Sequence, residues 1–265
     1  MQKGSEILRS LIRCIAMLLV FLERMTSHAA TGVAELDALG MNQSTFTQGN
    51  LSIDYCERVF RFSQAPMSIV LLWHGGSGRG NDNLTQLSTP SLRPLIDYLS
   101  RKRINAVVLV PQCPSSAKSW IDGGERSPMM ASRALVRSKA QANRVSATNT
   151  FFAGISMGGT AGWSLLAADA PNLFSKAVIC SGGGDTAKAP SITADVRIFN
   201  GGNDTVINPA LGEAMASAIN VSGGKATYVL LPDYDHFTAA DVAFSDLQWD
   251  WFFGSGKAGF IIKIQ

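Results

Sequence analysis

Residues 150–159 read T-F-F-A-G-I-S-M-G-G, and this stretch decides the fold. Its first six residues are mostly apolar or small, as in a short strand that is buried on both faces. Gly154, Ser156 and Gly158 then follow the spacing G-x-S-x-G, in which the glycines lack the Cβ atoms that would collide across a sharp strand-to-helix turn. The pattern predicts a strained serine at the end of a strand. The alternative is an ordinary glycine-rich turn.

Other short apolar runs end in the same way, at glycine, serine, proline or a polar residue. They span residues 67–73, 106–110, 176–180, 196–199 and 226–231. Helical candidates alternate with them at residues 92–101, 129–142, 160–169, 209–219 and 241–253. Two short β segments precede them, near Thr45 and at residues 52–62. This alternation predicts an α/β fold with a mostly parallel, doubly wound sheet covered by helices on both faces. In such sheets the functional residues follow the carboxyl ends of the strands.

A serine hydroxyl is a weak nucleophile and needs a neighbouring base, most often histidine. The chain has three histidines. His28 lies near the N-terminus, and His74 lies in the turn after the first buried run. His236 follows the last run, which is the chain position that a hydrolytic site on this type of sheet requires. We therefore expect His236 to serve as the base for Ser156.

The acidic partner should lie between the serine and the histidine in chain order. Asp204 lies in the glycine-rich turn that follows residues 196–199. Its carboxylate would hold the imidazole in one tautomer and stabilise the imidazolium. Three other aspartates fit less well. Asp185 follows an earlier strand, Asp195 precedes its strand, and Asp233 is too close to His236 in the chain.

Acyl transfer also needs backbone N–H donors for the tetrahedral intermediate, which form an oxyanion hole. One donor is expected from Met157, the residue after the nucleophile. The other is expected from the loop His74-Gly75-Gly76, most simply from Gly76, where the absence of a side chain lets a carbonyl approach the main chain. A plain β-turn is the alternative for this loop.

Trp120 is the candidate for an aromatic substrate platform, because it follows the exit loop of the second core strand. Trp73 and Trp163 are further candidates for the cleft wall. The alternative for Trp120 is packing on the surface of the domain. Only fifteen residues separate Cys180 from Val196, which leaves little room for a helical lid and predicts an open cleft that suits bulky or polymeric molecules.

With these residues in place, the chain resembles the secreted α/β-hydrolases known as predicted peptidases or phospholipase/carboxylesterase-like esterases, which are related to feruloyl esterases and polyhydroxybutyrate depolymerases. The resemblance covers roughly residues 67–253. It is carried by residues 74–83, 111–114 with Trp120, 154–159 and 179–185, and by the loops of Asp204 and His236. It implies the α/β-hydrolase fold and ester hydrolysis through an acyl-serine, with no metal and no organic cofactor. Arg79 departs from the pattern, since many relatives have an acidic residue near that position, and the tail after Gly254 matches nothing in the family.

Residues 1–30 are interpreted as a signal peptide, with residues 31–265 as the catalytic domain. A basic start precedes the nine-residue apolar run at residues 14–22, which is shorter than the roughly 20 residues of a membrane span. Small residues follow at Ala29 and Ala30. An uncleaved amphipathic anchor or a wrongly assigned start codon is the alternative. The interpretation places the mature protein in the periplasm or outside the cell, with no membrane span.

Charge and cysteine content limit the possible partners. Residues 1–30 hold four of the 23 basic residues and two of the 20 acidic ones, so the mature chain would carry a net charge of +1. Such a balance argues against a nucleic-acid partner. Cys56, Cys113 and Cys180 would be left, and these could hold one disulfide, such as Cys56–Cys113, or be three buried thiols.

Three functions are compatible with these residues. The first is a carboxylesterase acting on a small-molecule or polysaccharide-linked ester. The second is a serine peptidase of the same fold, since both reactions transfer an acyl group through the same triad. Peptidases of this fold usually add a propeller or a cap to select peptides, and this chain has no length for a propeller. The third is a non-catalytic binding protein, which would normally have lost a triad residue. The sequence does not indicate the oligomeric state.

Overall fold

The structure of the protein is a computed structural model that describes residue 34 and residues 36–168 and 173–254. The predicted signal peptide at residues 1–30 lies outside the described residues. Residues 1–40 and 41–265 form two separate units, and the second contains the whole sheet and all of the elements described below. No helix among the described residues has both the length and the hydropathy to cross a bilayer.

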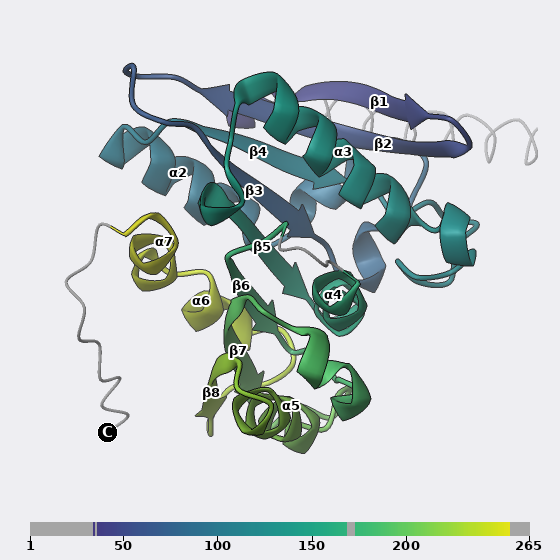
Figure 1. The fold of residues 1–265 in the computed structure, drawn as a ribbon, viewed down its shortest axis with the longest axis vertical. Coiled ribbons are helices and arrows are strands. Elements are labelled where there is room, and N and C mark those ends of the chain that lie inside the picture. The colour runs from purple at the N-terminus through teal and green to yellow at the C-terminus, as the bar shows by residue number, and fades with distance from the viewer. Residues whose placement is uncertain (1–33, 35, 169–172, 255–265) are drawn as a thin grey trace, which may run out of the picture. The chain divides into compact units, whose positions relative to one another are not determined.

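An eight-stranded sheet forms the centre of the second unit, in the order β1-β2-β4-β3-β5-β6-β7-β8 (Figure 1). The strands are β1 (Asn42–Gln48), β2 (Leu51–Phe60), β3 (Ser68–Trp73), β4 (Ala106–Pro111), β5 (Thr150–Ile155), β6 (Lys176–Cys180), β7 (Asp195–Gly201) and β8 (Lys225–Leu231). The β1–β2 and β2–β4 pairs are antiparallel, and every other pair is parallel. The mostly parallel sheet predicted from the apolar runs is confirmed.

Burial explains which strands are central. Every residue of β3, β4 and β5 is buried, because helices cover both faces of the sheet at these strands. At the far edge, β8 pairs only with β7 and exposes several of its residues, including Leu230. The apolar run at residues 226–231 predicts a strand buried on both faces, whereas β8 is a partly exposed edge strand.

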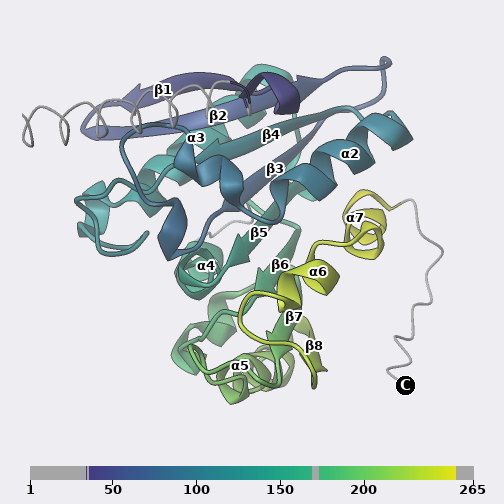
Figure 2. The ribbon, with the colours of Figure 1, turned by 180° about the vertical axis from the view of Figure 1, so that it is seen from behind.

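Helices cover the sheet on both faces (Figures 1 and 2). One face carries α3 (Pro128–Asn143), α4 (Met157–Ala167) and α5 (Ala210–Val221), and the other carries α2 (Leu92–Lys102), α6 (Ala239–Ala243) and α7 (Asp246–Phe253). The single helix predicted over residues 241–253 is wrong. The helix is interrupted at two residues that leave the helical conformation: Phe244 has a φ of −118°, and Ser245 has a ψ of 166°. The buried Phe244 ring stacks on Trp249.

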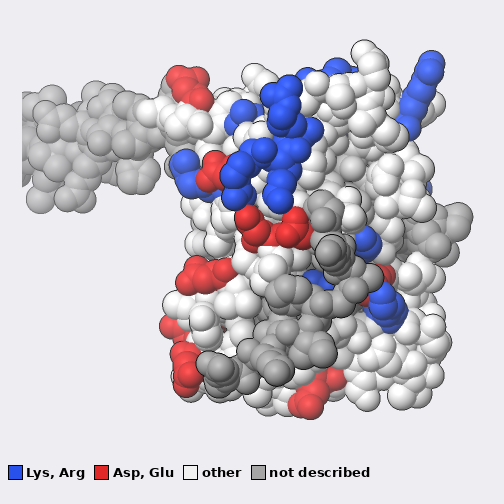
Figure 3. All heavy atoms as spheres, turned by 90° about the vertical axis from the view of Figure 1, so that its left-hand side faces the viewer, with Lys and Arg blue, Asp and Glu red and all other residues white. Residues whose placement is uncertain are grey.

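Polar contacts join α2 to α7. The Tyr98 hydroxyl donates to Asp250 Oδ1 at 2.7 Å, and Arg101 pairs with Asp246 at 3.0 Å. The face seen in Figure 3 carries a group of Lys and Arg side chains with Asp and Glu side chains next to it. Exposed ion pairs of this kind contribute little stability by themselves, so the helices are held mainly by the apolar residues beneath them.

The segment between β6 and β7 carries no lid. Its only regular element among the described residues is a short 3₁₀ helix, Thr186–Ser191. The α/β architecture without a large lid domain, which the short spacing between these strands predicts, is confirmed.

Candidate active site

Ser156 lies at a strained turn between β5 and α4. Its φ of 54° and ψ of −117° are unusual for a residue with a Cβ atom. The Ser156 N–H donates to the Cys180 carbonyl at 3.0 Å, which fixes the turn against β6. A Cβ at Gly154 would lie 2.8 Å from the Gly158 carbonyl oxygen, and a Cβ at Gly158 would lie 2.6 Å from the Trp73 carbonyl oxygen. Backbone contact therefore requires both glycines of the predicted turn.

The turns after β5, β7 and β8 bring Ser156, Asp204 and His236 together. His236 Nε2 lies 2.8 Å from Ser156 Oγ, and His236 Nδ1 lies 2.8 Å from Asp204 Oδ2. A carboxylate can only accept a hydrogen bond, so Nδ1 carries the proton and Nε2 can accept the proton of the serine hydroxyl. The three residues chosen from the sequence therefore have the geometry of a nucleophile, a base and an orienting acid.

Asp204 is fixed by the backbone that follows it. Its Oδ1 atom accepts the N–H groups of Val206 and Ile207, each at 2.8 Å, while Oδ2 faces His236. Only 8% of Asp204 and 4% of His236 is exposed, so water competes weakly for their hydrogen bond. One carboxylate oxygen is therefore used for anchoring and the other for the imidazole.

The rival carboxylates are used elsewhere or point to solvent. Asp185 accepts the N–H of Ala187 at the start of the 3₁₀ helix and pairs with Lys188. Asp195 pairs with Lys225 at the edge of the sheet. Asp233 is exposed. None of the three contacts the His236 ring through a hydrogen bond within the described residues.

The loops of Asp204 and His236 pack directly on each other. A Cβ at Gly201 would collide with the Tyr234 carbonyl oxygen. A Cβ at Gly202 would lie 2.7 Å from the Pro232 carbonyl oxygen. The Asn203 N–H also donates to the Tyr234 carbonyl at 2.9 Å. The glycine pair before the acid therefore allows the close approach that places the acid beside the base.

His74 is a buried structural residue with both ring nitrogens in use. Nδ1 lies 2.6 Å from the Gly75 carbonyl oxygen, to which it must donate, and Nε2 accepts the Cys113 N–H at 3.0 Å. Burial, with a smaller contribution from the charge of Arg79, lowers the pKa of His74 to about 4, although the Gly75 bond acts in the opposite direction. His74 is therefore neutral near pH 7 and holds the loop beside Ser156.

We expect His74 to make the fold sensitive to acid. The unfolded chain protonates this residue below about pH 6.5, whereas the folded chain resists protonation to about pH 4. The unfolded state thus binds more protons in this window, so stability present above pH 6.5 is lost as the pH falls toward 4. Between pH 7 and pH 4 the free energy of unfolding of the wild type should fall by roughly 3 kcal/mol more than that of His74→Gln. The glutamine keeps a hydrogen-bond donor and an acceptor but does not titrate.

Urea unfolding of the wild type and of His74→Gln at both pH values measures this difference. Other titrating groups contribute equally to the two proteins and cancel. Equal losses would contradict the neutral, buried state of His74.

The predicted oxyanion donors lie at the expected position in the chain. Gly75 adjoins the nucleophile, since a Cβ added to it would lie 3.3 Å from Ser156 Cβ. Within the described part of the chain, neither the Gly76 N–H nor the Met157 N–H donates a hydrogen bond to another residue. Both amides could therefore bind a substrate oxygen, and their role stays a prediction.

Trp120 does not line an open cleft. It is fully buried, stacks on Trp73 with ring centroids 4.4 Å apart, and donates its indole N–H to the His74 carbonyl at 3.3 Å. The prediction of a substrate platform at Trp120 is therefore wrong, as is the suggestion that Trp73 or the buried Trp163 lines the cleft. The sequence position after a strand is right, but the large apolar ring is packed into the core under the loop.

Phe237 is an exposed aromatic residue that the sequence analysis missed. It is 72% exposed, and its ring is perpendicular to the His236 imidazole with centroids 5.0 Å apart. Val206, which follows Asp204 by two residues, is 60% exposed. Apolar side chains therefore project to solvent from the two loops that carry the acid and the base. The position of Phe237 next to His236 in the sequence was the available signal.

The Gln112 side chain holds the loop after β3 through a set of hydrogen bonds, called here the Gln112 bracket, which the sequence did not indicate. The Gln112 side-chain amide donates to Asp82 Oδ1 at 2.7 Å and to the Gly78 carbonyl at 3.3 Å, while its oxygen accepts the Asn83 N–H at 2.8 Å. Burial acts to raise the pKa of Asp82, but hydrogen bonds from Thr85 and Gln112 outweigh it and lower that pKa. These bonds join Gly78, Asp82 and Asn83 of the loop to Gln112, which directly follows β4.

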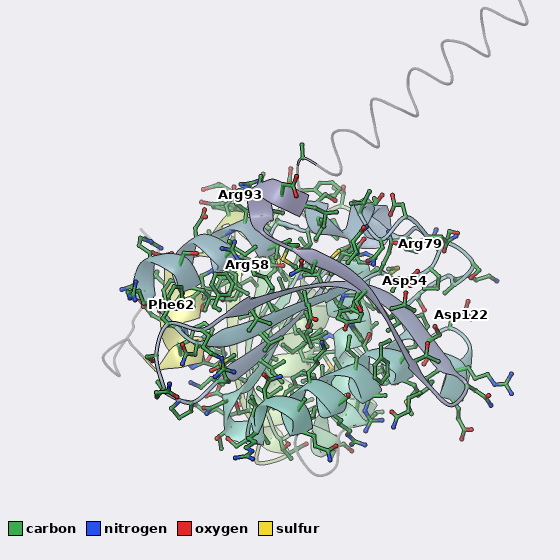
Figure 4. The ribbon with its side chains drawn as sticks, turned by 90° about the horizontal axis from the view of Figure 1, so that it is seen from above. Asp54, Arg58, Phe62, Arg79, Arg93 and Asp122 are labelled. Atoms are coloured by element: carbon green, nitrogen blue, oxygen red, sulfur yellow. The ribbon has the colours of Figure 1, made fainter. Side chains whose placement is uncertain are left out.

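Arg79 and Asp122 hold the neighbouring loop. Arg79 donates to the Ala117 carbonyl at 2.8 Å, and Asp122 accepts the Lys118 N–H at 2.8 Å. Figure 4 shows Arg79 and Asp122 at the same end of the unit, far from Phe62. The basic residue at position 79 therefore binds backbone carbonyls, a contact that an acidic residue could not make.

Cys56, Cys113 and Cys180 are buried and not disulfide bonded, so the suggested Cys56–Cys113 disulfide is absent. Burial raises the pKa of each thiol, to about 12 for Cys56 and Cys180 and about 11 for Cys113. They are therefore protonated, weakly reactive thiols. Among the described residues, no group of three His, Cys, Asp or Glu side chains lies close enough to share a metal ion.

No protein-family model and no curated protein matches the sequence. Solved structures do match. A thermostable esterase is 22% identical with a TM-score of 0.68, and the match covers 81% of this chain and 62% of the esterase, so this chain spans less than two thirds of its length. An esterase of Pyrococcus furiosus is 12% identical with a TM-score of 0.61, over 83% of this chain and 93% of that one.

The acylaminoacyl peptidase of Pyrococcus horikoshii is 12% identical with a TM-score of 0.61, over 84% of this chain and 43% of the peptidase. At such identities the similarity concerns the fold alone. The chain has the α/β-hydrolase fold that the sequence predicts.

Proposed function

We propose that this α/β-hydrolase-fold protein is a serine hydrolase that cleaves carboxylic esters through an acyl-serine intermediate. The single observation that supports the proposal best is the pair of 2.8 Å contacts that link Ser156 Oγ to His236 and His236 to Asp204. The proposed kinship with feruloyl esterases and polyhydroxybutyrate depolymerases rests on the sequence motifs alone.

The geometry supports the following sequence of steps. His236 Nε2 takes the hydroxyl proton as Ser156 Oγ attacks the ester carbonyl, and Asp204 stabilises the imidazolium. The negative charge on the carbonyl oxygen would be bound by the Gly76 and Met157 N–H groups. The imidazolium then protonates the leaving alcohol as the C–O bond breaks. Water, deprotonated by the same imidazole, hydrolyses the acyl-serine and restores the free hydroxyl.

The short segment between β6 and β7, whose described residues form no lid, favours ester hydrolysis over peptide hydrolysis. Esterases and an acylaminoacyl peptidase share the fold, so the fold by itself does not separate the two reactions. A short 3₁₀ helix is the only regular element among the described residues between β6 and β7, and Ser156 is partly exposed. Such an open site would admit an ester on a bulky or carbohydrate-linked molecule, and it offers little to select a peptide.

Activity measurements with and without the nucleophile test the proposal. Short-chain, feruloyl and acetyl-sugar esters should be hydrolysed by the wild type, with peptide amides cleaved far more slowly, and Ser156→Ala should lose all of these activities. Cleavage of peptide amides in preference to every ester would favour the peptidase. Ester hydrolysis that persists in Ser156→Ala would refute the assigned nucleophile.

Phe237 should favour esters with an aromatic acyl group. Stacking of an aromatic acyl group on this exposed ring is worth about 0.5–1.5 kcal/mol. Phe237→Ala is therefore expected to lower kcat/KM for a feruloyl ester by about 3- to 10-fold and to leave an acetyl ester nearly unchanged.

Steady-state kinetics on the two esters measure this selectivity. Val221→Ala is the matched control, because Val221 is 86% exposed at the end of α5 and should change neither rate. An equal loss for both esters in Phe237→Ala would show that the ring supports His236 instead of selecting the acyl group.

A further inference from the structure

One dipeptide makes hydrogen bonds to all three segments that carry the candidate triad. The Cys180 carbonyl accepts the Ser156 N–H at 3.0 Å. The Ser181 N–H donates to the carbonyl of Phe199, on the strand that leads to the acid's turn, at 2.8 Å. The Ser181 hydroxyl donates to the His236 carbonyl at 2.8 Å. Only the last of these bonds depends on a side chain.

Ser181 adopts a backbone conformation that favours glycine. Its φ of 48° is in the left-handed region, where a Cβ atom is unfavourable. Three glycines follow directly at positions 182–184, so glycine at 181 would fit the local pattern at a lower conformational cost. A serine in this position indicates that its hydroxyl is needed, and Ser181 is indeed fully buried with that hydroxyl bonded to His236.

We infer that Ser181 is a positioning residue for the proposed reaction, which acts by fixing the main chain of His236. This inference rests on the proposed role of His236 as the base. Among the described residues, the Ser181 hydroxyl is the one hydrogen-bond partner of the His236 main chain, and the Ser156–His236 contact at 2.8 Å depends on where that main chain lies. Because the Ser181 site is buried, water cannot replace the lost donor without rearrangement. The hydroxyl therefore keeps the imidazole within reach of the nucleophile.

Two substitutions separate positioning from ordinary packing. Ser181→Ala removes the hydroxyl and keeps the unfavourable Cβ, whereas Ser181→Gly removes both and relieves the backbone. Ser132→Ala is the matched control, because Ser132 is also a fully buried serine, on α3, and its hydroxyl has no partner among the described residues.

The rate at which a fluorophosphonate labels Ser156 is the main readout, since it requires an activated serine but no particular ester. Both Ser181 variants should be labelled about 10- to 100-fold more slowly, and kcat should fall likewise, because the base is displaced. KM should stay within about twofold, since the change affects the chemical step. In urea, Ser181→Gly should be at least as stable as Ser181→Ala. Ser132→Ala should be labelled at the wild-type rate.

The outcomes distinguish this inference from the proposed function. The inference about Ser181 would be overturned if both Ser181 variants were labelled at the wild-type rate. It would also be overturned if Ser181→Gly were both more stable than Ser181→Ala and labelled at the wild-type rate. Wild-type labelling without hydrolysis of any ester would refute the esterase proposal, while the labelling rates would still decide the role of Ser181. If the wild type is not labelled at all, both ideas fail.

Discussion

Replacing His236 with alanine is expected to lower kcat for ester hydrolysis by about 10⁶-fold, as much as Ser156→Ala does. The reason is that the 2.8 Å contact between Nε2 and Ser156 Oγ makes the two side chains one functional unit. Without the base the hydroxyl keeps its proton, and without the hydroxyl the base has nothing to activate. The double variant should be no slower than either single variant.

Burst and steady-state kinetics on an activated ester measure these losses. Ser132→Ala again serves as the control, because its buried hydroxyl lies outside the site and has no hydrogen-bond partner in the described part of the chain. Losses that multiply in the double variant would mean that the residues act independently. The same conclusion would follow if His236→Ala kept a substantial fraction of the activity.

Asp204→Asn is expected to lower kcat by about 10⁴-fold with the fold intact. Oδ1 of Asp204 accepts two backbone N–H groups, from Val206 and Ile207, so an asparagine would keep its carbonyl oxygen there. Its NH₂ group would then face His236 Nδ1 and donate to it. The imidazole proton would be forced onto Nε2, where it would point at Ser156 Oγ and remove the acceptor that the hydroxyl needs.

Asp233→Asn is the matched control, because Asp233 lies three residues from His236 but is exposed. It should keep nearly full activity. Steady-state kinetics of the two variants, together with their urea unfolding midpoints, decide between the carboxylates. Full activity in Asp204→Asn with loss in Asp233→Asn would reassign the acid.

Local patterns predicted the candidate triad because each residue follows a recognisable strand. The run before Ser156 is apolar. Gly158, at the start of α4, cannot be replaced, because a Cβ added there would lie 2.6 Å from the Trp73 carbonyl oxygen on β3. Asp204 and His236 could be chosen by chain order alone. The start of α4 was predicted three residues late, because Gly158 and Gly159 are poor helix formers and tertiary contacts override that weakness.

Other features depend on packing that no local pattern reveals. Trp120 and Phe237 both follow strands in the sequence, yet the first is fully buried and the second is 72% exposed. The difference arises from stacking of Trp120 on Trp73, a partner 47 positions away along the chain. The Gln112 bracket and the Ser181 hydroxyl likewise act across segments distant in sequence. Residues of this kind can be identified only once the sheet order is known.

The proposed function depends on Ser156 being an activated nucleophile, and covalent labelling tests this most directly. After reaction with an excess of a fluorophosphonate, intact mass spectrometry and peptide mapping should find one label per chain, on Ser156, and none in His236→Ala over the same time. A label on another residue, or a wild-type chain that takes up none, would contradict it.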